Sequence, residues 1–403
     1  MHNWLPKFAF RECDEWRQYL AYASGVLAPI PDQSSNMRVA VIGSRGFPST
    51  YSGFETLVRW LAPALARRGH EVTVYGRGGT NKHRPVAAND VTTINTVGLE
   101  TKSTSTLSYG LTSTIDALVR RSDVALVLNV ANGYYVPVLE RAGIPTVANV
   151  DGVEWARAKW NTLGRHVFRA GARSTARFAS AIVADSKAIQ RFWAEEFGRS
   201  STFIPYGAEV TRDRSTRRIE QLGLRPDGYL LVVARLVPEN NIDLSLDAVE
   251  RLPGEHLVVV GTSGYRSPVE DRLRALSQTG RAKWLGHVSD QDLLLDLWAN
   301  CAGYIHGHSV GGTNPSLLQA MGAGAPTIAL DTPYNREVLA REDALYQRDA
   351  GDLSRRLSEL LASPDARAYH RFACQARIRD EYTWPHVCLA YERLLRAMPV
   401  RAL

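Results

Sequence analysis

A loop rich in glycine and small polar residues joins a short apolar strand to a helix in the last third of the chain. The strand is predicted at Ala302–Ile305, the loop at His306–Asn314, and Pro315 opens the helix, because the fixed φ of proline suits a first helical position. The first backbone N–H groups of a helix lack partners within it, so they bind anions or hydroxyl groups. The segment predicts a site for a phosphorylated or hydroxyl-rich ligand; the alternative is an ordinary strand–loop–helix connection.

A second glycine-containing turn, Gly43–Glu55, follows the first clear strand, which starts just after Met37. A dinucleotide fingerprint would need GxGxxG here and an acidic residue after the second strand. The glycine spacing differs, Gly76–Arg77 follows the second strand, and the turn does not end in Gly-Lys-Ser/Thr. This argues against a nicotinamide or flavin enzyme and against a Walker A loop. Ser52–Gly53 opens a predicted helix whose N–H groups suit a phosphate or a sugar hydroxyl.

Strands and helices alternate through the rest of the chain, which predicts parallel sheets with right-handed crossovers. Two such sheets in series are expected to face each other across a cleft, with ligands at the carboxyl ends of the strands. A polar, arginine-rich linker is predicted at Thr211–Arg218. In the first half we predict strands at Arg38–Gly43, Val72–Tyr75, Val124–Asn129, Thr146–Val150, Ala181–Ala184 and Thr202–Pro205, and helices at Gly53–Arg68, Leu107–Arg121, Leu163–Ala179 and Lys187–Phe197. In the second half we predict strands at Tyr229–Ala234, His256–Gly261, Lys283–Leu285, Gly303–Ile305 and Thr327–Leu330, and helices at Ile242–Leu252, Pro268–Ser277, Asp290–Ala299 and Pro315–Met321.

Composition limits the class of protein. The chain has 403 residues, 45% of them hydrophobic and 22% charged, which is typical of a soluble globular protein of two or three domains. Its longest apolar runs are too short to cross a bilayer. The net charge of +7 predicts an anionic partner: a nucleotide, a nucleic acid or a membrane surface. The four cysteines are scattered without a CxxC pair, so we expect reduced thiols in a cytoplasmic protein and no metal site.

Residues 1–36 differ from the rest of the chain. They combine two tryptophans, mixed charges and a polar, proline-containing end, and they lack the basic and apolar regions of a signal peptide. The sequence predicts either a disordered extension or a start codon assigned too far upstream. A short segment that docks on a membrane or a partner is the alternative.

Five motifs in order resemble those of retaining glycosyltransferases of the GT-B fold, the family 4-like group that includes sucrose, mannose and rhamnose transferases. The resemblance covers nearly everything from Met37 onward. It implies two Rossmann-like, doubly wound α/β domains that face each other across a cleft, with a C-terminal helix that crosses back to the first. The five motifs are Ser52–Gly53, Arg67–Val72, Val233–Glu239, Gly286–Asp290 and Thr383–Trp384.

Longer literal matches resemble a bacterial rhamnosyltransferase subgroup of this family. They lie at Gly43–Pro48, Asn149–Trp155, Pro238–Ile242 and His308–Pro315. The resemblance implies transfer of L-rhamnose, with retention, from dTDP-L-rhamnose to a hydroxyl of a lipid-linked saccharide in cell-surface polysaccharide synthesis. It implies a cytoplasmic enzyme, peripheral on the inner face of the cell membrane. It also implies an acceptor domain at 37–210, a donor domain at 211–385 and a returning helix at 386–403.

The sequence departs from the family at four positions. The family has two glutamates in the donor loop, where this chain has Gly311 and Gln319. The family also has a lysine where this chain has Asn240 and a histidine where this chain has Asp151. Backbone N–H groups of Gly311 to Asn314 must then replace the first glutamate, and the Gln319 amide oxygen can still accept from a ribose hydroxyl. A catalytically inactive sugar-nucleotide binding protein is one alternative to the transferase. A GT-B nucleotide-sugar epimerase is another.

The resemblance assigns a chemical role to several side chains. Arg235 directly follows a strand and would grip the leaving diphosphate, because a guanidinium binds phosphate oxygens in a bidentate way; its alternative is a surface arginine. Asp151, with Glu154, would lie near the anomeric carbon or the acceptor hydroxyl; the alternative for Asp151 is a turn residue before Gly152. The helix starts and Arg235 make a metal unnecessary. The implied donor-binding residues are Ser52, Gly53, Arg235, Glu239, Gly261, Val288, His308, Gly311, Gly312, Thr313, Asn314 and Gln319.

Four further side chains have two interpretations each. His306 and His308 flank the donor loop and either bind a phosphate or sugar hydroxyl or are packed, neutral loop histidines. Glu239 either lies near the nucleotide or serves the entry to a helix. Asp290 imitates a metal-binding DxD pattern with Asp292, but it opens a helix, so an N-cap role is predicted.

A basic stripe is predicted on the helix at Leu163–Ala179. Its arginines recur every four residues, which keeps them on one face. Such a stripe suits an anionic membrane surface or a lipid-diphosphate acceptor; the alternative is a solvated face or pairing with acids elsewhere. Nucleic-acid binding is disfavoured because the sequence has no nucleic-acid module. The basic stripe consists of Arg165, Arg169, Arg173 and Arg177.

Overall fold

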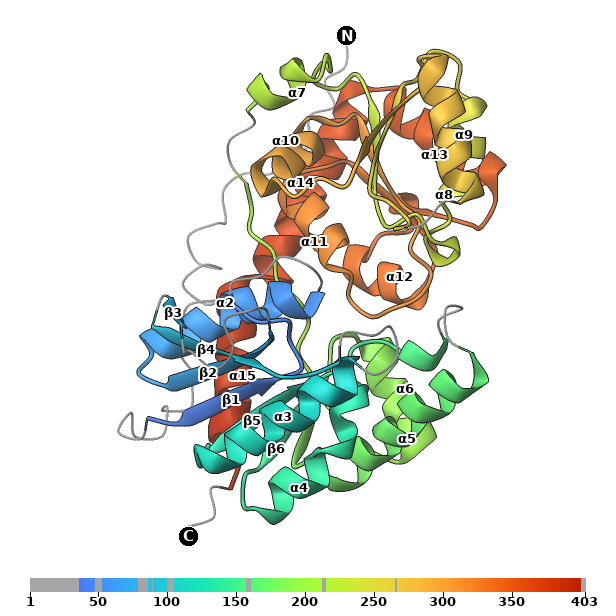
Figure 1. Cartoon of the computed structure of the whole chain (residues 1–403). Helices are drawn as coiled ribbons and strands as arrows, with labels where there is room; N and C mark the ends of the chain where they lie inside the picture. Colours follow the sequence, from blue (N-terminus) through green and yellow to red (C-terminus); the bar gives the residue numbers. More distant parts are fainter. Residues whose placement is uncertain are drawn as a thin grey trace, which may run out of the picture. The chain divides into compact units, whose positions relative to one another are not determined.

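Two largely parallel sheets organise the part of the chain that the computed structural model describes, residues 36–47, 53–78, 86–88, 90–99, 105–156, 161–211, 215–264 and 267–399. We call them the sheets of the first and second lobes (Figure 1); both lobes belong to one unit, Arg38–Leu403. The first sheet contains β1 (Arg38–Ile42), β2 (Glu71–Arg77), β3 (Val86–Ala88), β4 (Val91–Thr96), β5 (Val124–Leu128), β6 (Thr146–Asn149), β7 (Ala181–Ala184) and β8 (Thr202–Phe203). The second contains β9 (Leu230–Val233), β10 (Leu257–Val260), β11 (Ala282–Gly286), β12 (Gly303–His306), β13 (Thr327–Leu330) and β14 (Leu345–Tyr346).

Helices connect these strands. In the first lobe they are α2 (Gly53–Arg67), α3 (Ser105–Val119), η1 (Val130–Tyr134), α4 (Val136–Arg141), η2 (Glu154–Ala156), α5 (Thr162–Phe178) and α6 (Lys187–Phe197). In the second they are α7 (Arg217–Gln221), η3 (Pro238–Asn240), α8 (Ile242–Glu250), α9 (Pro268–Gln278), α10 (Gln291–Asn300), α11 (Pro315–Gly322), α12 (Pro333–Leu339), η4 (Glu342–Ala344), α13 (Ala350–Leu361) and α14 (Pro364–Glu381), followed by α15 (Trp384–Arg396).

The strand order of each sheet creates a point where the winding reverses. The first sheet has the order β3-β4-β2-β1-β5-β6-β7-β8 and the second β11-β10-β9-β12-β13-β14. Only the β3–β4 pair is antiparallel among the described pairs. In the second sheet the first strand, β9, lies between β10 and β12, so the connections run in opposite directions on its two sides. Ligands bind outside the carboxyl ends of the strands at such a switch point.

The central strands are apolar because helices cover both faces of each sheet. All five residues of β5 are buried, as are all four of β10, as expected for parallel strands without a solvent face. One apolar cluster fills the first lobe, including Ile42, Val127 and Trp193, and a second fills the other lobe. This confirms the predicted fold class of two Rossmann-like α/β domains.

Most predicted elements lie within a few residues of their predicted positions, and the differences have physical causes. The linker predicted at Thr211–Arg218 overlaps α7, which begins at Arg217. The strand predicted at Thr202–Pro205 pairs with β7 only over Thr202–Phe203, because Pro205 has no N–H to donate. Strands β3 and β4 were not predicted; they form an antiparallel hairpin at the sheet edge, where polar threonines hide the apolar pattern.

The C-terminal helix α15 packs against α2 of the first lobe. Before it, Ala208 and Thr383 form a parallel bridge, and the rings of Trp60 and Trp384 stack 5.5 Å apart. The Asn149 side-chain amide donates to the Tyr391 hydroxyl at 2.6 Å. α15 therefore reaches the end of β6, the strand that leads into the predicted catalytic region.

A buried carboxylate on α15 supplies a second anchor. Glu392, 2% exposed, forms ion pairs with Arg68 and Arg396, and its carboxylate lies 3.3 Å from Nε2 of His70. The cations lower the pKa of Glu392 although burial acts in the opposite direction, whereas burial lowers the pKa of His70. Because a buried carboxylate needs such partners, the charge of Glu392 favours one placement of α15 on the first lobe.

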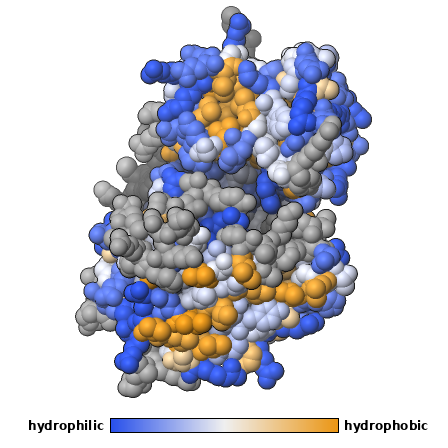
Figure 2. Space-filling model, viewed as in Figure 1, coloured by the Kyte–Doolittle hydropathy of each residue, from blue (hydrophilic) through white to orange (hydrophobic). Residues whose placement is uncertain are grey.

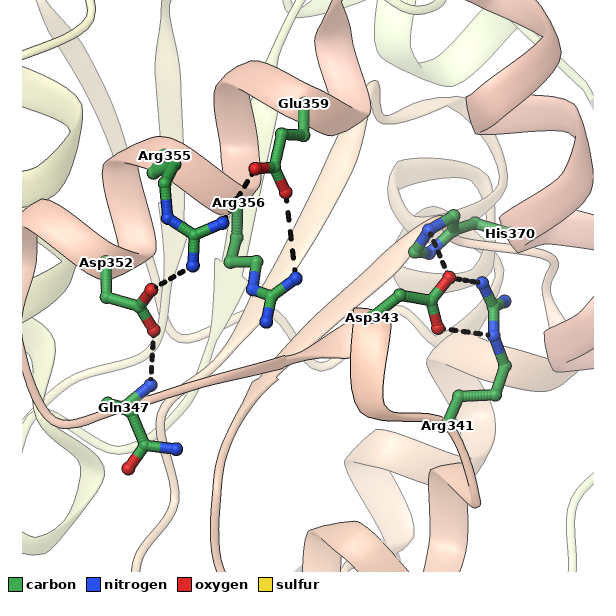
Figure 3. A network of polar contacts seen from close by, with 8 residues as sticks. All are labelled: Arg341, Asp343, Gln347, Asp352, Arg355, Arg356, Glu359 and His370. Atoms are coloured by element: carbon green, nitrogen blue, oxygen red, sulfur yellow. Dashed lines mark hydrogen bonds and ion pairs between the residues drawn. The ribbon is translucent and has the colours of Figure 1, made fainter.

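Polar contacts link η4 to α14 and, separately, stabilise α13 in the second lobe (Figure 3). Asp343 accepts from Arg341 and faces His370 of α14 at 3.7 Å, and Arg355 bonds to Asp352 and Glu359 within α13. The pKa of Asp343 is lowered by Arg341 against the effect of burial, and burial lowers that of His370. The contact between Asp343 and His370 joins η4 to α14, and these residues lie outside the candidate site.

Three cysteines, Cys301, Cys374 and Cys388, are buried thiols, and burial raises the pKa of Cys388 to about 12. Among the described residues, no helix combines the length and apolar character that a membrane span requires. Almost all of the predicted extension, residues 1–35, lies outside the described residues.

Replacing Tyr391 by Phe tests the anchor of α15. The variant leaves the Asn149 amide without its buried acceptor, so the free energy of unfolding should fall by about 1–2 kcal/mol, measured by denaturant titration. The matched control is Tyr369→Phe, whose side chain is 59% exposed and should change the free energy by less than about 0.5 kcal/mol. Equal effects of the two substitutions would refute a special role for the Tyr391 hydroxyl.

Candidate functional site

The donor loop, residues 307–314, leaves β12 at the carboxyl edge of the second sheet and enters α11. Asn314 caps this helix: its side-chain oxygen accepts from the Ser316 N–H at 3.0 Å, and Pro315 takes the first helical position. The first N–H groups of α11 therefore open toward the loop, as the sequence predicts. Such a helix start favours an anion or hydroxyl ligand through its unpaired N–H groups and its dipole.

The segment after β9 holds the donor loop through hydrogen bonds to backbone carbonyl groups of both segments. The Asn241 side chain donates to the Gly307 carbonyl at 2.7 Å, and Ser309 donates both its N–H and its hydroxyl to the Glu239 carbonyl. Asn335 of α12 adds a bond to the His308 carbonyl at 3.1 Å. Glu239 thus supports the loop with its main chain, and its side chain remains available at the rim.

Arg235 lies two residues after β9, directly at the switch point of the second sheet. Its backbone carbonyl accepts from Asn240 at 2.8 Å, whereas its side chain is exposed and makes no hydrogen bond with a described residue. Gly261 ends the neighbouring β10; a Cβ there would lie 1.9 Å from the Ala234 carbonyl oxygen. Only glycine therefore allows these two strand ends to approach. The arrangement leaves the Arg235 guanidinium available for a phosphate.

The remaining predicted donor residues differ in position. Val288 is half-buried after β11, and Gln319 is half-buried on α11. His306 is fully buried, its ring stacks on that of His308 with centroids 4.3 Å apart, and its Nδ1 lies 3.1 Å from the Tyr304 hydroxyl. Burial, then His308, lowers the pKa of His306 well below its usual value. Of the two interpretations of His306, the structure favours the packed, neutral histidine.

The donor loop touches the first lobe through glycine backbone. A Cβ on Gly152 would lie 2.9 Å from the Cα of Gly311, and a Cβ on Gly312 would lie 1.8 Å from a carboxylate oxygen of Asp185. The Thr313 hydroxyl donates to the Asp185 carbonyl. Residues after β6 and β7 of the first lobe therefore meet the donor loop of the second.

Two helix starts converge at the same place. A Cβ on Gly53, the first residue of α2, would lie 3.3 Å from the Tyr206 hydroxyl and 3.5 Å from Pro315 of α11. N–H groups from both lobes can therefore act on one ligand. Ser52, the other predicted residue of this turn, lies outside the described residues.

Carboxyl groups of the first lobe surround this junction. Asp151 directly follows the residue after β6, in a left-handed conformation with φ of 52°, and its N–H donates to the Asn149 side chain at 3.0 Å. Glu154 is 9% exposed on η2. Because Asn149 also donates to Tyr391, α15 indirectly positions Asp151. The geometry agrees with a turn role for Asp151 and also leaves its half-buried side chain near the donor loop.

Sequence reasoning missed Asp185. It is 1% exposed, and burial, followed by the charge of Asp151, raises its pKa well above its usual value. Burial, followed by the charges of Asp151 and Asp185, raises the pKa of Tyr206, so both groups favour their neutral forms. The available signal was an acidic residue directly after the buried strand Ala181–Ala184, the same pattern that singled out Asp151 after the neighbouring strand.

The basic stripe forms as predicted on α5, and all four arginines are exposed. Arg169 pairs with Glu196 of α6, and Arg177 lies over the Phe178 ring at 5.4 Å. Arg165 and Arg173 form no ion pair with a described residue. Asp290 caps α10 by accepting from the N–H groups of Asp292 and Leu293, which confirms the N-cap interpretation.

A hollow of about 930 Å³ lies elsewhere, where the chain crosses between the lobes. Its lining includes Trp60, Glu209, Gln375, Arg379 and Trp384. Neither Arg235 nor the donor loop lines it. Its size suits a small ligand, and its lining also includes the start of α15, residues 383–386.

Comparisons with known proteins agree with this division of the chain. Residues 215–379 match the family model described as glycosyl transferases group 1, and residues 36–209 match a domain of unknown function, DUF1972. The serotype-specific mannosyltransferase WbdA of Escherichia coli is 26% identical over 200 residues, which cover 46% of this chain and 24% of that protein. The alignment thus spans about a quarter of that relative.

Solved structures share the fold. Sucrose-phosphate synthase from Thermosynechococcus elongatus has a TM-score of 0.78 at 16% identity, covering 89% of this chain and 98% of that one. HepE from Anabaena in complex with UDP-glucose has a TM-score of 0.73 at 15% identity, covering 90% and 100%. The two-lobed fold is therefore that of GT-B proteins, and the family match supports the prediction of a glycosyltransferase.

Replacing Asn241 by Asp tests how the donor loop is held. The carboxylate cannot donate to the Gly307 carbonyl, and it keeps the size and left-handed tolerance of asparagine. We expect a loss of about 1–3 kcal/mol in the free energy of unfolding, measured by denaturant titration at neutral pH. Wild-type stability of the variant would contradict the assigned contact.

Proposed function

We propose that the protein is a hexosyltransferase that moves a sugar from a nucleoside diphosphate to a hydroxyl group of a saccharide in cell-surface polysaccharide synthesis. One observation carries the proposal. Arg235, the donor loop and the start of α11 meet at the switch point of the second sheet, within the region that matches the group 1 glycosyltransferase family. A guanidinium beside free helix N–H groups suits a diphosphate whose negative charge grows as the sugar leaves.

The proposed donor is dTDP-L-rhamnose, and the proposed outcome at the anomeric carbon is retention. The resemblance of four long motifs to the rhamnosyltransferase subgroup supports both. The similar proteins named above act on mannose or are bound to UDP-glucose, so other donor sugars are outcomes of the test. A protein that binds a sugar nucleotide without turnover is the alternative, favoured by the absence of the family's two glutamates at Gly311 and Gln319.

In the proposed reaction the bond between the anomeric carbon and the diphosphate oxygen breaks while a bond to the acceptor oxygen forms. The acceptor hydroxyl releases its proton, and the departing diphosphate accepts it. Arg235 and the N–H groups of α2 and α11 stabilise the charge on the diphosphate. Asp151, together with Glu154, stabilises positive charge on the sugar ring or orients the acceptor. These groups make the proposed transfer independent of a metal ion.

We infer that the acceptor is lipid-linked and that the first lobe rests on an anionic membrane. The large apolar side chains that are exposed in the described residues lie, apart from two on α14, on α3, η1, α4 and α5 or just before α3. Figure 2 has apolar residues gathered where Figure 1 places α3 and α4. η1 contacts all three helices, so these elements make one surface. Its apolar residues are Val97, Leu99, Leu111, Ile115, Val119, Tyr134, Val138, Leu163 and Phe178.

Charge complements this apolar surface. Leu111, Ile115 and Val119 recur every four residues on α3, where Val119 is 76% exposed, and the basic stripe follows on α5 without an acidic residue in that helix. Apolar side chains beside arginines favour the interface of an anionic bilayer. This would bring a lipid-linked acceptor to the lobe that carries Asp151.

Replacing Arg235 by Ala tests the donor site. Loss of a charge-assisted contact to the diphosphate should weaken the binding of UDP or dTDP by roughly 10- to 100-fold, and reduce kcat/KM with the active donor at least as much. Calorimetric titration with both nucleotides and a panel of their sugars measures this. The control is Arg217→Ala, an exposed arginine on α7, which should bind as wild type. If neither nucleotide binds wild type, the transferase assignment is wrong.

Sedimentation with vesicles tests the membrane contact. Wild type should bind vesicles containing phosphatidylglycerol more strongly than phosphatidylcholine alone. Reversing Arg165 and Arg173 to Glu should weaken this by about tenfold or more, because each juxtamembrane arginine contributes about 1 kcal/mol. Reversing the charges of Arg217 and Arg225, both exposed, changes the net charge of the protein by the same amount. This control lies on the second lobe and should have little effect on vesicle binding. Equal losses, or dimerisation of wild type through the apolar surface, would contradict a membrane-docking role.

A further inference from the structure

We propose that Asp185 is a positioning residue that holds the donor loop against the first lobe through a neutral, protonated carboxyl group. Seating of the loop then takes up one proton, and release of the loop gives it back. The inference rests on the proposed role of the loop in donor binding. It adds a residue of the other lobe that controls where the loop lies.

The carboxyl group of Asp185 is enclosed and has no adequate partner. The residue is 1% exposed, and neither carboxyl oxygen forms a hydrogen bond with a described residue. The backbone N–H groups of Asp185 and Thr313 lie close enough to favour the ionised form, but neither forms a hydrogen bond of good geometry. A carboxylate enclosed in this way loses its hydration without compensation, which is strongly unfavourable. A neutral carboxyl group avoids most of this cost.

Contact with the donor loop is what encloses this carboxyl group. A Cβ on Gly312 would fall 1.8 Å from one carboxyl oxygen and 2.3 Å from the other, so the glycine main chain lies directly on the group. The adjacent Thr313 hydroxyl donates to the Asp185 carbonyl. Separation of the loop from β7 would expose the carboxyl group to water, where its pKa returns toward the ordinary value. The protonation state of Asp185 and the position of the loop are therefore coupled.

Like charges around Asp185 act in the same direction as burial. Asp151 after β6 and Glu337 on α12 both raise the pKa of Asp185. Three tyrosines also interact with it electrostatically: Tyr206 after β8, Tyr334 on α12 and Tyr391 on α15. Burial raises the pKa of each tyrosine, and an ionised Asp185 would raise it further. These tyrosines are neutral at physiological pH, so they supply no compensating positive charge.

The sign of the pH dependence follows from these facts. The pKa of Asp185 is raised when the loop is seated and ordinary when the loop is released. Seating is therefore most stable at low pH and weakens as the pH rises toward and through the raised pKa, by at most about tenfold per pH unit for one proton. An asparagine at this position stays neutral and keeps the shape of the protonated acid.

Hydrogen exchange of the free protein tests the proposal without a nucleotide. Protection of residues 309–314 and 151–153, corrected for intrinsic exchange, should fall in wild type between about pH 5 and about pH 9, by at most about tenfold per unit, and should level off once the raised pKa of Asp185 is passed. In Asp185→Asn it should stay within about twofold across that range. A second variant, Glu337→Gln, removes one like charge and lowers the pKa of Asp185 in the seated state, so the loss of protection should be smaller and should level off at a lower pH. The same pH slope in wild type and Asp185→Asn would overturn the proposal.

A steric variant covers the case in which Asp185→Asn does not fold. Gly312→Ala places a methyl group on the Asp185 carboxyl, so residues 309–314 should lose protection at every pH while the two apolar cores keep theirs. Unchanged protection in Gly312→Ala would also overturn the proposal. Because none of these experiments uses a sugar nucleotide, failure to bind UDP or dTDP would refute the proposed function and leave this inference standing.

Discussion

The contact of glycine backbone between the two lobes is the constraint on which the candidate site depends. Gly152 after β6 and Gly311 in the donor loop approach so closely that a side chain on Gly152 would meet the main chain of the loop. This contact brings the carboxyl edges of both sheets to one place. The starts of α2 and α11, Arg235 and the carboxyl groups of the first lobe then act on the same small volume. A side chain at Gly152 would keep these two segments apart.

The electrostatics of the junction divide between the lobes in a way that suits group transfer. The second lobe offers positive potential from Arg235 and the start of α11, where a diphosphate would gather negative charge. The first lobe offers carboxyl groups in different environments: Asp185 is enclosed and burial raises its pKa, whereas Asp151 is half-buried near the donor loop. Neighbouring acids with different environments can have different roles. Asn149 connects this division to the fold, because it bonds to both Asp151 and Tyr391 of the returning helix.

The alternation of apolar strands and amphipathic helices was enough to predict both lobes. Buried runs such as Val124–Leu128, and caps such as Asn314 and Asp290, carry local information that the fold preserves. The β3–β4 hairpin was missed because its edge position tolerates polar residues. The position of the donor loop at a helix start was also readable, because Pro315 and the glycines before it determine local geometry.

Contacts between distant segments could not be read from local pattern. The burial of Asp185 depends on Gly312, far along the chain, so its environment appears only when the loop is placed against β7. The apolar surface was hidden for a related reason: Leu111, Ile115 and Val119 have the spacing of an ordinary core-facing stripe, and only the packing of α3 shows that they are exposed. Among the arginines of α5, the pairing of Arg169 with Glu196 likewise needed the structure.

The most direct test of the account is a crystal structure of the protein soaked with a nucleoside diphosphate, dTDP or UDP. The account predicts the diphosphate at the carboxyl edge of the second sheet, with its oxygens on the Arg235 guanidinium and on backbone N–H groups of residues 311–316. Binding of the diphosphate in the hollow lined by Trp60, Arg379 and Trp384, with the donor loop unoccupied, would contradict it.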